Sequence, residues 1–116
     1  MKILVAGSRT FFDYNLMEKI LLGFPKPSLI IEGGARGADL LAKQYAINYQ
    51  IDVKEVPADW DRFGKSAGYK RNVEMANLLD KDEDMAVVFW DGKSTGSKHM
   101  IEILNEYNIE CFVIRF

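Results

Sequence analysis

The fold prediction starts from one stretch of the sequence, Leu29-Ile30-Ile31-Glu32-Gly33-Gly34-Ala35-Arg36-Gly37-Ala38-Asp39. Its apolar start is typical of the end of a buried strand, and the glycines lead into a segment with helical periodicity. Such a junction often binds anions, because glycines let the backbone approach a ligand and a helix start presents unpaired N–H groups. Arg36 adds donors suited to phosphate or carboxylate. The alternative is a tight turn that needs glycine for its geometry alone.

Working outward, apolar runs alternate with segments of helical spacing. We expect strands over residues 2–6, 28–31, 51–56, 85–90 and 110–116. We expect helices over residues 14–22, 37–49 and 71–79, and a last helix marked by Met100, Ile103, Leu104 and Tyr107. Residues 58–69 show no clean period and predict a long loop with room for a helical turn. The charged segment 80–84 predicts a solvated connection.

This alternation predicts an α/β fold, a Rossmann-like three-layer sandwich of about five mainly parallel strands with four helices. The loops 7–10, 33–37, 59–72 and 91–97 all follow strands, so we expect them to meet at one rim of the sheet. In such sheets ligands bind outside the carboxyl ends of the strands, where the strand order reverses. The shared rim therefore favours a ligand site over a set of unrelated turns.

The composition limits the class of protein. The 116 residues carry a net charge of −2, with 48% hydrophobic and 28% charged residues, which predicts one globular domain over residues 1–116. The single Cys111 cannot form an internal disulfide and predicts a reducing cytoplasm. No apolar run approaches the length of a membrane span or of a signal peptide, so we expect no membrane partner. The acidic balance argues against a generic nucleic-acid coat protein.

No common catalytic or phosphate fingerprint is present, neither G-x-G-x-x-G nor a Walker-type loop. His99 is the only histidine and is expected to be a surface helix residue, while Cys111 is expected to be an inert residue of the last strand. Carboxylates alone show no ligand spacing, so we expect no metal and no resident cofactor. What remains is a recognition surface at the rim.

The residues of that surface divide by chemistry. Positive charge would come from Arg9, Arg36 and Arg71, with Arg62, Lys65 and Lys70 as further sources. Hydroxyl groups would come from Ser8, Ser94, Thr95 and Ser97. The aromatic side chains that can stack on a base are Trp60, Phe63, Tyr69 and Trp90, although for Trp90 packing in the core is favoured. The residues expected to bind a ligand are Gly7, Ser8, Arg9, Gly33, Gly34, Arg36, Gly37, Asp39, Trp60, Arg71, Asn72, Asp91, Gly92, Ser94, Gly96 and Ser97.

Several motifs together resemble the YspA-related branch of the SLOG superfamily, which also includes the LOG phosphoribohydrolases and the DNA-processing protein DprA. They are Gly7-Ser8-Arg9, residues 33–39, Ala58-Asp59-Trp60 with Gly64 and Ala67-Gly68, Arg71-Asn72 with Met75, and Phe89-Trp90-Asp91-Gly92 with Ser94 and Gly96. The resemblance covers essentially the whole chain. It implies a Rossmann-like fold, a pocket for a nucleotide or nucleotide derivative, self-association into a dimer or larger homo-oligomer, and an origin in phages or bacterial conflict systems.

One departure from the superfamily bears on catalysis. LOG enzymes carry a P-G-G-x-G-T-x-E-E type motif, and alignment on Gly96-Ser97 puts His99 and Met100 where its catalytic glutamates would stand. Ser97 replaces the threonine and keeps a hydroxyl. Asp91, Asp39 or Glu32 are the carboxylates that can substitute for the missing glutamates.

Three hypotheses follow. The first is a sensor or sequestering domain that binds a nucleotide derivative, such as an ADP-ribose-like, NAD-like or cyclic nucleotide. The second is a nucleotide N-glycosidase or phosphoribohydrolase with Asp91 or Asp39 as the catalytic carboxylate. The third and less favoured is single-stranded nucleic-acid binding, with Trp60 and Tyr69 as stacking platforms and positive charge from Arg62, Lys65, Lys70 and Arg71.

Overall fold

The computed structural model describes residues 1–116, and its apolar runs form one five-stranded parallel sheet in the order β3-β2-β1-β4-β5. The strands are β1 (Lys2–Gly7), β2 (Leu29–Glu32), β3 (Asp52–Glu55), β4 (Met85–Trp90) and β5 (Glu110–Arg115). The longer helices are α1 (Tyr14–Leu22), α2 (Ala38–Asn48), α4 (Ala67–Asn77) and α5 (Thr95–Glu106). The predicted Rossmann-like α/β fold is therefore confirmed.

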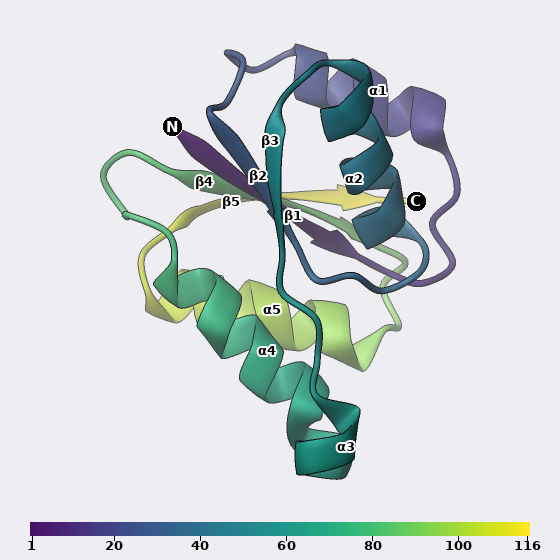
Figure 1. Ribbon diagram of the computed structural model, residues 1–116, viewed down its shortest axis with the longest axis vertical. Helices are drawn as coiled ribbons and strands as arrows, with labels where there is room; N and C mark the ends of the chain where they lie inside the picture. Colours follow the sequence, from purple (N-terminus) through teal and green to yellow (C-terminus); the bar gives the residue numbers. More distant parts are fainter.

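The helices form two layers around the sheet. Helices α1 and α2 cover one face and α4 and α5 cover the other (Figure 1). Because successive side chains of a strand point to opposite faces, Ile3 and Val5 enter the core under α1 and α2, whereas Leu4 and Ala6 enter the core against α4 and α5. This double burial explains why the central strands are almost continuously apolar. No helix has the length and apolar character needed to span a membrane.

The strand order reverses next to β1. The chain leaves β1 through α1 toward β2 and β3, and then returns through α4 to place β4 on the other side of β1. Residue Gly7 pairs with Phe89, and the Ser8 N–H donates to the Phe89 carbonyl over 2.8 Å. The loops after β1 and β4 therefore begin side by side, at the position where open parallel sheets bind ligands.

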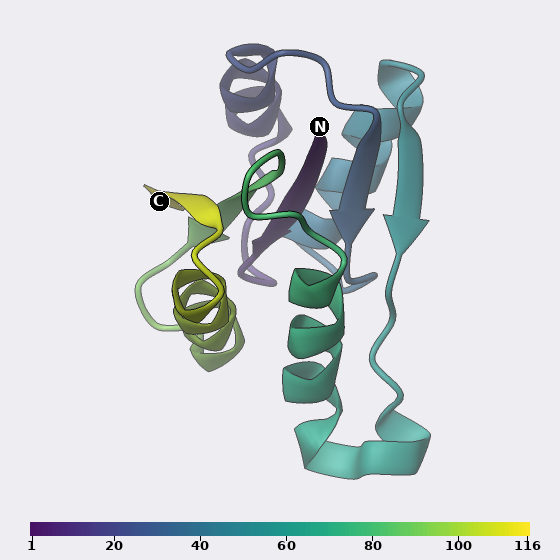
Figure 2. The same cartoon turned by 90° about the vertical axis from the view of Figure 1, so that its left-hand side faces the viewer.

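The predicted loop over residues 58–69 is mostly helical, so that prediction was wrong in extent. A short helix α3 (Trp60–Phe63) and a 3₁₀ turn (Gly64–Ser66) lead into α4, which begins at Ala67 and not at residue 71. Asp59 caps α3, because its carboxylate accepts from the Arg62 N–H over 3.1 Å. The buried Ala67 anchors the start of α4. Figure 2 shows α3 beyond the end of α4, away from the sheet.

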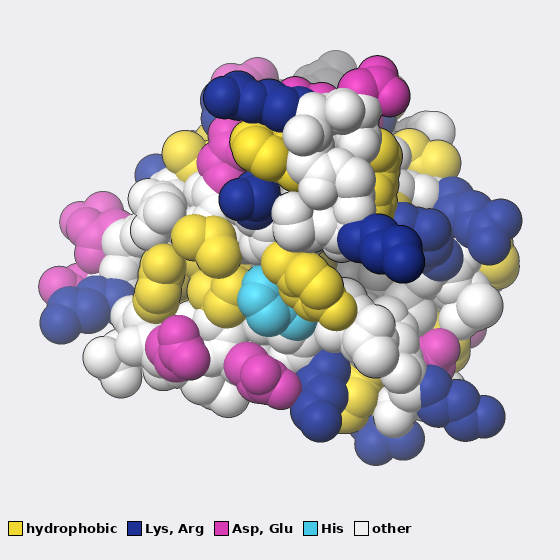
Figure 3. Space-filling view, turned by 90° about the horizontal axis from the view of Figure 1, so that it is seen from below, with side chains coloured by type: hydrophobic (Ala, Val, Ile, Leu, Met, Phe, Trp, Pro, Cys, Tyr) yellow, Lys and Arg dark blue, Asp and Glu magenta, His cyan; other side chains and the backbone are white.

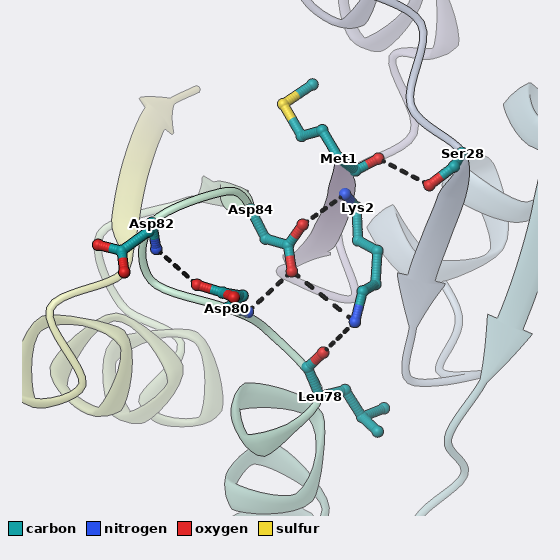
Figure 4. A network of polar contacts seen from close by, with 7 residues as sticks. All are labelled: Met1, Lys2, Ser28, Leu78, Asp80, Asp82 and Asp84. Atoms are coloured by element: carbon teal, nitrogen blue, oxygen red, sulfur yellow. Dashed lines mark hydrogen bonds and ion pairs between the residues drawn. The ribbon is translucent and has the colours of Figure 1, made fainter.

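The charged connection 80–84 is not solvated throughout, because Asp84 is buried beneath the amino end of β1 (Figure 4). Its carboxylate accepts from the N–H groups of Lys2 at 2.7 Å and Asp80 at 2.8 Å. The Lys2 ammonium lies 3.8 Å from the same carboxylate and donates to the Leu78 carbonyl. Asp84 thus satisfies backbone donors that would otherwise be unpaired, at the rim opposite the loops that follow β1 and β4.

The closing strand β5 forms one edge of the sheet. Its Cys111 packs against the core on the α5 side, and burial raises the pKa of the thiol to about 11. A thiol with this pKa stays protonated near neutral pH, which agrees with the expectation of an inert cysteine.

Substitution of Gly7 tests the close approach of β1 to its neighbours. A Cβ at Gly7 would lie 2.4 Å from the Phe89 carbonyl oxygen and 2.8 Å from the Ala38 Cβ. We expect Gly7→Ala to lower the free energy of unfolding by about 2 kcal/mol or more in urea denaturation. Gly96→Ala is the matched control, since a Cβ there meets nothing within 4 Å and alanine favours the helix. Equal stability of the two variants would contradict the proposed close packing.

Candidate functional site

A cavity of about 410 Å³ opens at the carboxyl end of β1, between the loops after β1 and β4 and the amino-terminal parts of α4 and α5. It is lined by Ala6, Gly7, Ser8, Arg9, Thr10, Ala35, Asp39, Trp60, Lys65, Gly68, Tyr69, Arg71, Asn72, Met75, Asp91, Ser94, Thr95, Gly96, Ser97 and Met100. Most of the expected ligand-binding residues lie in this set. The convergence of loops at one rim, predicted from the alternation of elements, is observed.

Asp91 organises the loop that follows β4. Its Oδ1 accepts from the N–H groups of Lys93 and Ser94, both at 2.8 Å, and the Thr10 hydroxyl lies 3.4 Å from its Oδ2. The Asp91 N–H in turn donates to the buried Ser8 hydroxyl over 3.1 Å. These backbone donors hold the pKa of Asp91 below its ordinary value, so the group is an anion at neutral pH. Asp91 therefore ties the β1 loop to the β4 loop.

The first turn of α5 forms one wall of the cavity. Ser94 caps the helix, with its hydroxyl accepting from the Ser97 N–H over 3.4 Å and lying 3.2 Å from the Ser97 hydroxyl. Thr95 and Gly96 are the first helical residues, and both line the cavity. The first N–H groups of a helix lack partners within it and carry its positive dipole end. This wall can receive an anion.

A chain of hydrogen bonds links three loops across the site. The Arg71 Nη1 donates to the Gly33 carbonyl over 2.6 Å, and its Nε donates to the Asn72 Oδ1 over 3.2 Å. The Asn72 amide nitrogen donates to the Gly96 carbonyl over 3.1 Å and lies 3.2 Å from the His99 Nδ1. Asn72 is buried, and its amide is engaged within the protein, so it positions the loops of β2 and β4 from α4.

His99 is half-buried rather than a plain surface residue. Its ring lies 4.4 Å from the Tyr69 ring in an edge-on arrangement, between α4 and α5. On the face that carries these helices, the histidine lies among hydrophobic side chains (Figure 3). Because the Asn72 amide donates to its Nδ1, the neutral ring carries its proton on Nε2. His99 does not line the cavity, so it supports Asn72 and Tyr69 from behind.

The glycine loop uses its own carboxylates to satisfy its N–H groups. The Gly34 N–H donates to the Glu32 Oε1 over 2.6 Å, and the Ala35 N–H donates to the Asp39 Oδ2 over 3.2 Å. Both carboxyl side chains are buried, and the Glu32 Oε2 has no hydrogen-bond partner. The expected phosphate cradle of backbone N–H groups in this loop is thus partly occupied from within the chain.

Burial also changes the protonation of these two carboxyl groups. It raises the pKa of Glu32 to about 7, although the Gly34 hydrogen bond opposes the shift. It raises the pKa of Asp39 to about 6, opposed mainly by the nearby Arg71. Asp39 lines the cavity, whereas Glu32 lies behind the loop. The site therefore combines a cavity carboxyl that titrates near neutral pH with the anionic Asp91.

Arg36 does not line this cavity but a second depression beside it, also of about 410 Å³. This depression is lined by Arg9, Gly33, Gly34, Ala35, Arg36, Pro57, Ala58, Trp60 and Arg71. The two hollows meet where the Arg9 guanidinium lies 5.9 Å from the centre of the Trp60 ring. The expected residues Gly33, Gly34 and Arg36 thus border the second hollow and not the first.

Two expected residues line neither hollow, Gly37 and Gly92. Both have a positive φ, of 83° and 84°. A Cβ at Gly37 would lie 2.5 Å from the Ser8 carbonyl oxygen, and one at Gly92 would collide with the Arg115 guanidinium. Glycine is therefore required at both positions for the shape of the loops. Trp90 packs as expected, with its Nε1 donating to the Ser94 carbonyl over 3.0 Å.

The sequence patterns did not identify part of the lining. Ala6, Met75 and Met100 are core residues that also border the cavity, and their apolar spacing predicted only burial. Gly68 was assigned to a loop, although it lies in the first turn of α4. The position of Thr10 directly after the Gly7–Arg9 motif is the one sequence feature that indicates a place in the cavity lining.

Comparisons with known proteins agree with this architecture. A family model described as "YspA, cpYpsA-related SLOG family" matches residues 1–63. The Gene 61 protein of Mycobacterium phage D29 is 32% identical over 107 residues, covering 84% of this chain and 83% of that protein. An X-ray structure of DNA processing protein A (DprA) from Streptococcus pneumoniae has a TM-score of 0.77 and 21% identity, covering 99% of this chain and 50% of that one. This last likeness concerns the fold alone.

The buried Glu32 predicts a pH-dependent stability. Its folded pKa of about 7 exceeds the ordinary value of 4.5, so its contribution to stability is complete below about pH 4.5 and is lost as the pH rises through 7. We expect the Tm of the wild type to fall between about pH 5.5 and about pH 8.5, and Glu32→Gln to flatten this dependence. Glu74→Gln, at an exposed position of α4, is the control. Equal slopes for wild type and Glu32→Gln would contradict the assignment.

Proposed function

This chain belongs to the YspA, cpYpsA-related SLOG family, and from that premise we propose that it binds a nucleotide or nucleotide derivative, as a sensor or sequestering domain. The observation that carries the proposal is the cavity of about 410 Å³ at the point where the strand order reverses. Its volume lies within the range of small-molecule sites, and its position is the one at which open α/β sheets bind nucleotides.

The lining supplies the complementary chemistry for each part of a nucleotide. The first turn of α5 offers a phosphate the N–H groups of Thr95 and Gly96 and the hydroxyls of Ser94, Thr95 and Ser97, whereas the N–H groups of Ser94 and Ser97 are paired within the protein. Trp60 and Tyr69 are about half exposed and border the cavity, which suits stacking on a base. Asp91 is an anionic acceptor within reach of sugar hydroxyls at the same rim.

Positive charge at the mouth supports an anionic ligand. Arg9 is exposed and forms no ion pair, since the ion pairs of the structure join Lys2 with Asp84 and Lys43 with Glu55. The chain as a whole has a net charge of −2, whereas the cavity lining carries Arg9, Lys65 and Arg71 beside Asp39 and Asp91.

Thermal-shift measurements with AMP, NAD, ADP-ribose and cyclic AMP test the proposal. A ligand present at about one hundred times its Kd would stabilise the fold by about 2.7 kcal/mol and raise the Tm by several degrees. For any of these ligands that raises the Tm of the wild type, we expect Arg9→Ala to reduce the increase. The Tm without ligand should stay unchanged, because the Arg9 side chain is exposed. Lys26→Ala, an exposed residue of the opposite rim, is the control. No shift with any of these compounds would refute nucleotide binding by this site.

A second candidate function, a nucleotide N-glycosidase or phosphoribohydrolase, is favoured by Asp39. Its buried carboxyl lines the cavity, and burial raises its pKa to about 6. Such a group can protonate a leaving base or, once ionised, stabilise the positive charge that develops on the ribose.

Incubation with AMP and NAD, followed by chromatography for released base, tests the enzymatic alternative. If Asp39 is catalytic, Asp39→Asn should reduce base release by at least about a hundredfold while retaining nucleotide binding. Asp91→Asn is the comparison, because it loses the other carboxylate of the cavity. Absence of base release from the wild type would leave binding as the function of the site.

A further inference from the structure

The second depression is more basic than the cavity beside it. Arg9, Arg36 and Arg71 line it, and none of its lining residues is a carboxylate. The main cavity, in contrast, also contains Asp39 and Asp91. A hollow with several arginines and no acid attracts an anion rather than a neutral group.

Two of the three arginines of this depression have no partner in the protein. Arg9 and Arg36 form neither a hydrogen bond through their side chains nor an ion pair, and both are exposed. Arg71, in contrast, donates to the Gly33 carbonyl and to Asn72, and the nearby Asp39 carboxylate partly offsets its charge. Burial lowers the pKa of Arg71, and the charge of Arg9 adds to that shift. Arg9 and Arg36 are therefore the side chains available to an external anion.

The spacing of the two anion-attracting places restricts the ligand. The first turn of α5 follows β4, and Arg36 follows β2, with β1 between these strands. Neighbouring strands lie about 4.8 Å apart, so the carboxyl ends of β2 and β4 lie about 10 Å apart and the two places belong to separate loops. The two phosphorus atoms of a pyrophosphate share one oxygen and are too close to occupy both places. Phosphates on the 3′ and 5′ sides of one ribose are further apart, so each can reach a different loop.

The boundary between the hollows suits the nucleoside that would connect two such phosphates. Arg9 and Trp60 border both hollows and stack on each other at 5.9 Å. The indole is 50% exposed and therefore has a free surface for a base. Arg9 lines both hollows and can therefore contribute its charge to either one.

We propose that the two hollows together bind a nucleoside phosphorylated on both its 3′ and 5′ sides, with one phosphate at the start of α5 and the other beside Arg36. This inference rests on the proposed nucleotide binding and adds the class of ligand. The chemistry is shared by a free nucleoside 3′,5′-bisphosphate and by one unit of a single-stranded oligonucleotide.

Calorimetric titration with AMP, ADP-ribose and adenosine 3′,5′-bisphosphate tests the inference. We expect the wild type to bind the bisphosphate at least about tenfold more tightly than AMP, because a second charge-assisted contact is added. ADP-ribose should not show this gain, since its phosphates are adjacent. In Arg36→Ala the ratio of the bisphosphate and AMP affinities should fall to about one, and in Arg36→Glu it should fall below one.

Lys26→Ala is the matched control and should keep the wild-type ratio. Equal affinity of the wild type for AMP and the bisphosphate, or equal weakening of both by Arg36→Ala, would overturn the two-phosphate site while leaving nucleotide binding intact. Absence of binding by every compound would overturn the proposed function and this inference with it. A 5′-phosphorylated deoxyadenosine oligonucleotide distinguishes a strand of nucleic acid from a free nucleotide as the ligand. If the oligonucleotide and the free bisphosphate both bind more tightly than AMP in an Arg36-dependent way, the site accepts either ligand. If only the free bisphosphate binds more tightly than AMP, the ligand is a small molecule.

Discussion

The pairing of β1 with β4 is the constraint on which the rest of the structure depends. It brings Gly7 opposite Phe89 and lets the Ser8 N–H donate to the Phe89 carbonyl. The two loops that leave these strands are then close enough for the Ser8 hydroxyl to accept from the Asp91 N–H. Because β2 lies on the other side of β1, the glycine loop after β2 completes the same rim. The order of the strands therefore brings these loops together at the rim where open parallel sheets bind ligands.

The electrostatics of the rim come from side chains more than from loop backbone. Glu32 and Asp39 accept from N–H groups of the glycine loop, which leaves fewer of them for a ligand. The arginines at the rim, in contrast, have no carboxylate partner in hydrogen-bond distance. Burial raises the pKa of Glu32 to about 7, which limits its negative charge near neutral pH, whereas Asp39, with a pKa of about 6, stays mostly ionised beside Arg71. The arginines without a carboxylate partner are the feature that favours an anionic ligand.

Much of the fold follows from local patterns. The run from Met85 to Trp90 predicted a strand buried on both faces, and every residue of it except Trp90 is fully buried. The alternation of elements was sufficient to place the loops on one rim. The start of α4 was missed because Gly64 and Gly68 are loop signals by sequence, whereas capping by Asp59 and the burial of Ala67 override them. Asp84 was missed because its partner, Lys2, is distant in the sequence.

The sequence predicted that these loops share one rim of the sheet, but not that the rim holds two separate hollows. Arg36 and Gly33 belong to a motif typical of anion binding, yet they line the second hollow, which shares only Arg9, Ala35, Trp60 and Arg71 with the cavity at β1. The position of Trp60 depends on the packing of α3, which no local pattern reveals. The Glu32 Oε2 atom lacks a hydrogen-bond partner because the folded chain buries it, and no local sequence pattern reveals this burial either.

Binding of a nucleotide at the reversal of strand order is the central claim, and a titration of the ¹⁵N-labelled protein with AMP, followed by backbone amide NMR, tests it most directly. If AMP binds there, the largest chemical-shift changes fall on Ser8 to Thr10 and on Ser94 to Ser97, with smaller changes at Trp60. Changes confined to β5 or to the loop before β2, or a spectrum that AMP does not alter, would contradict it.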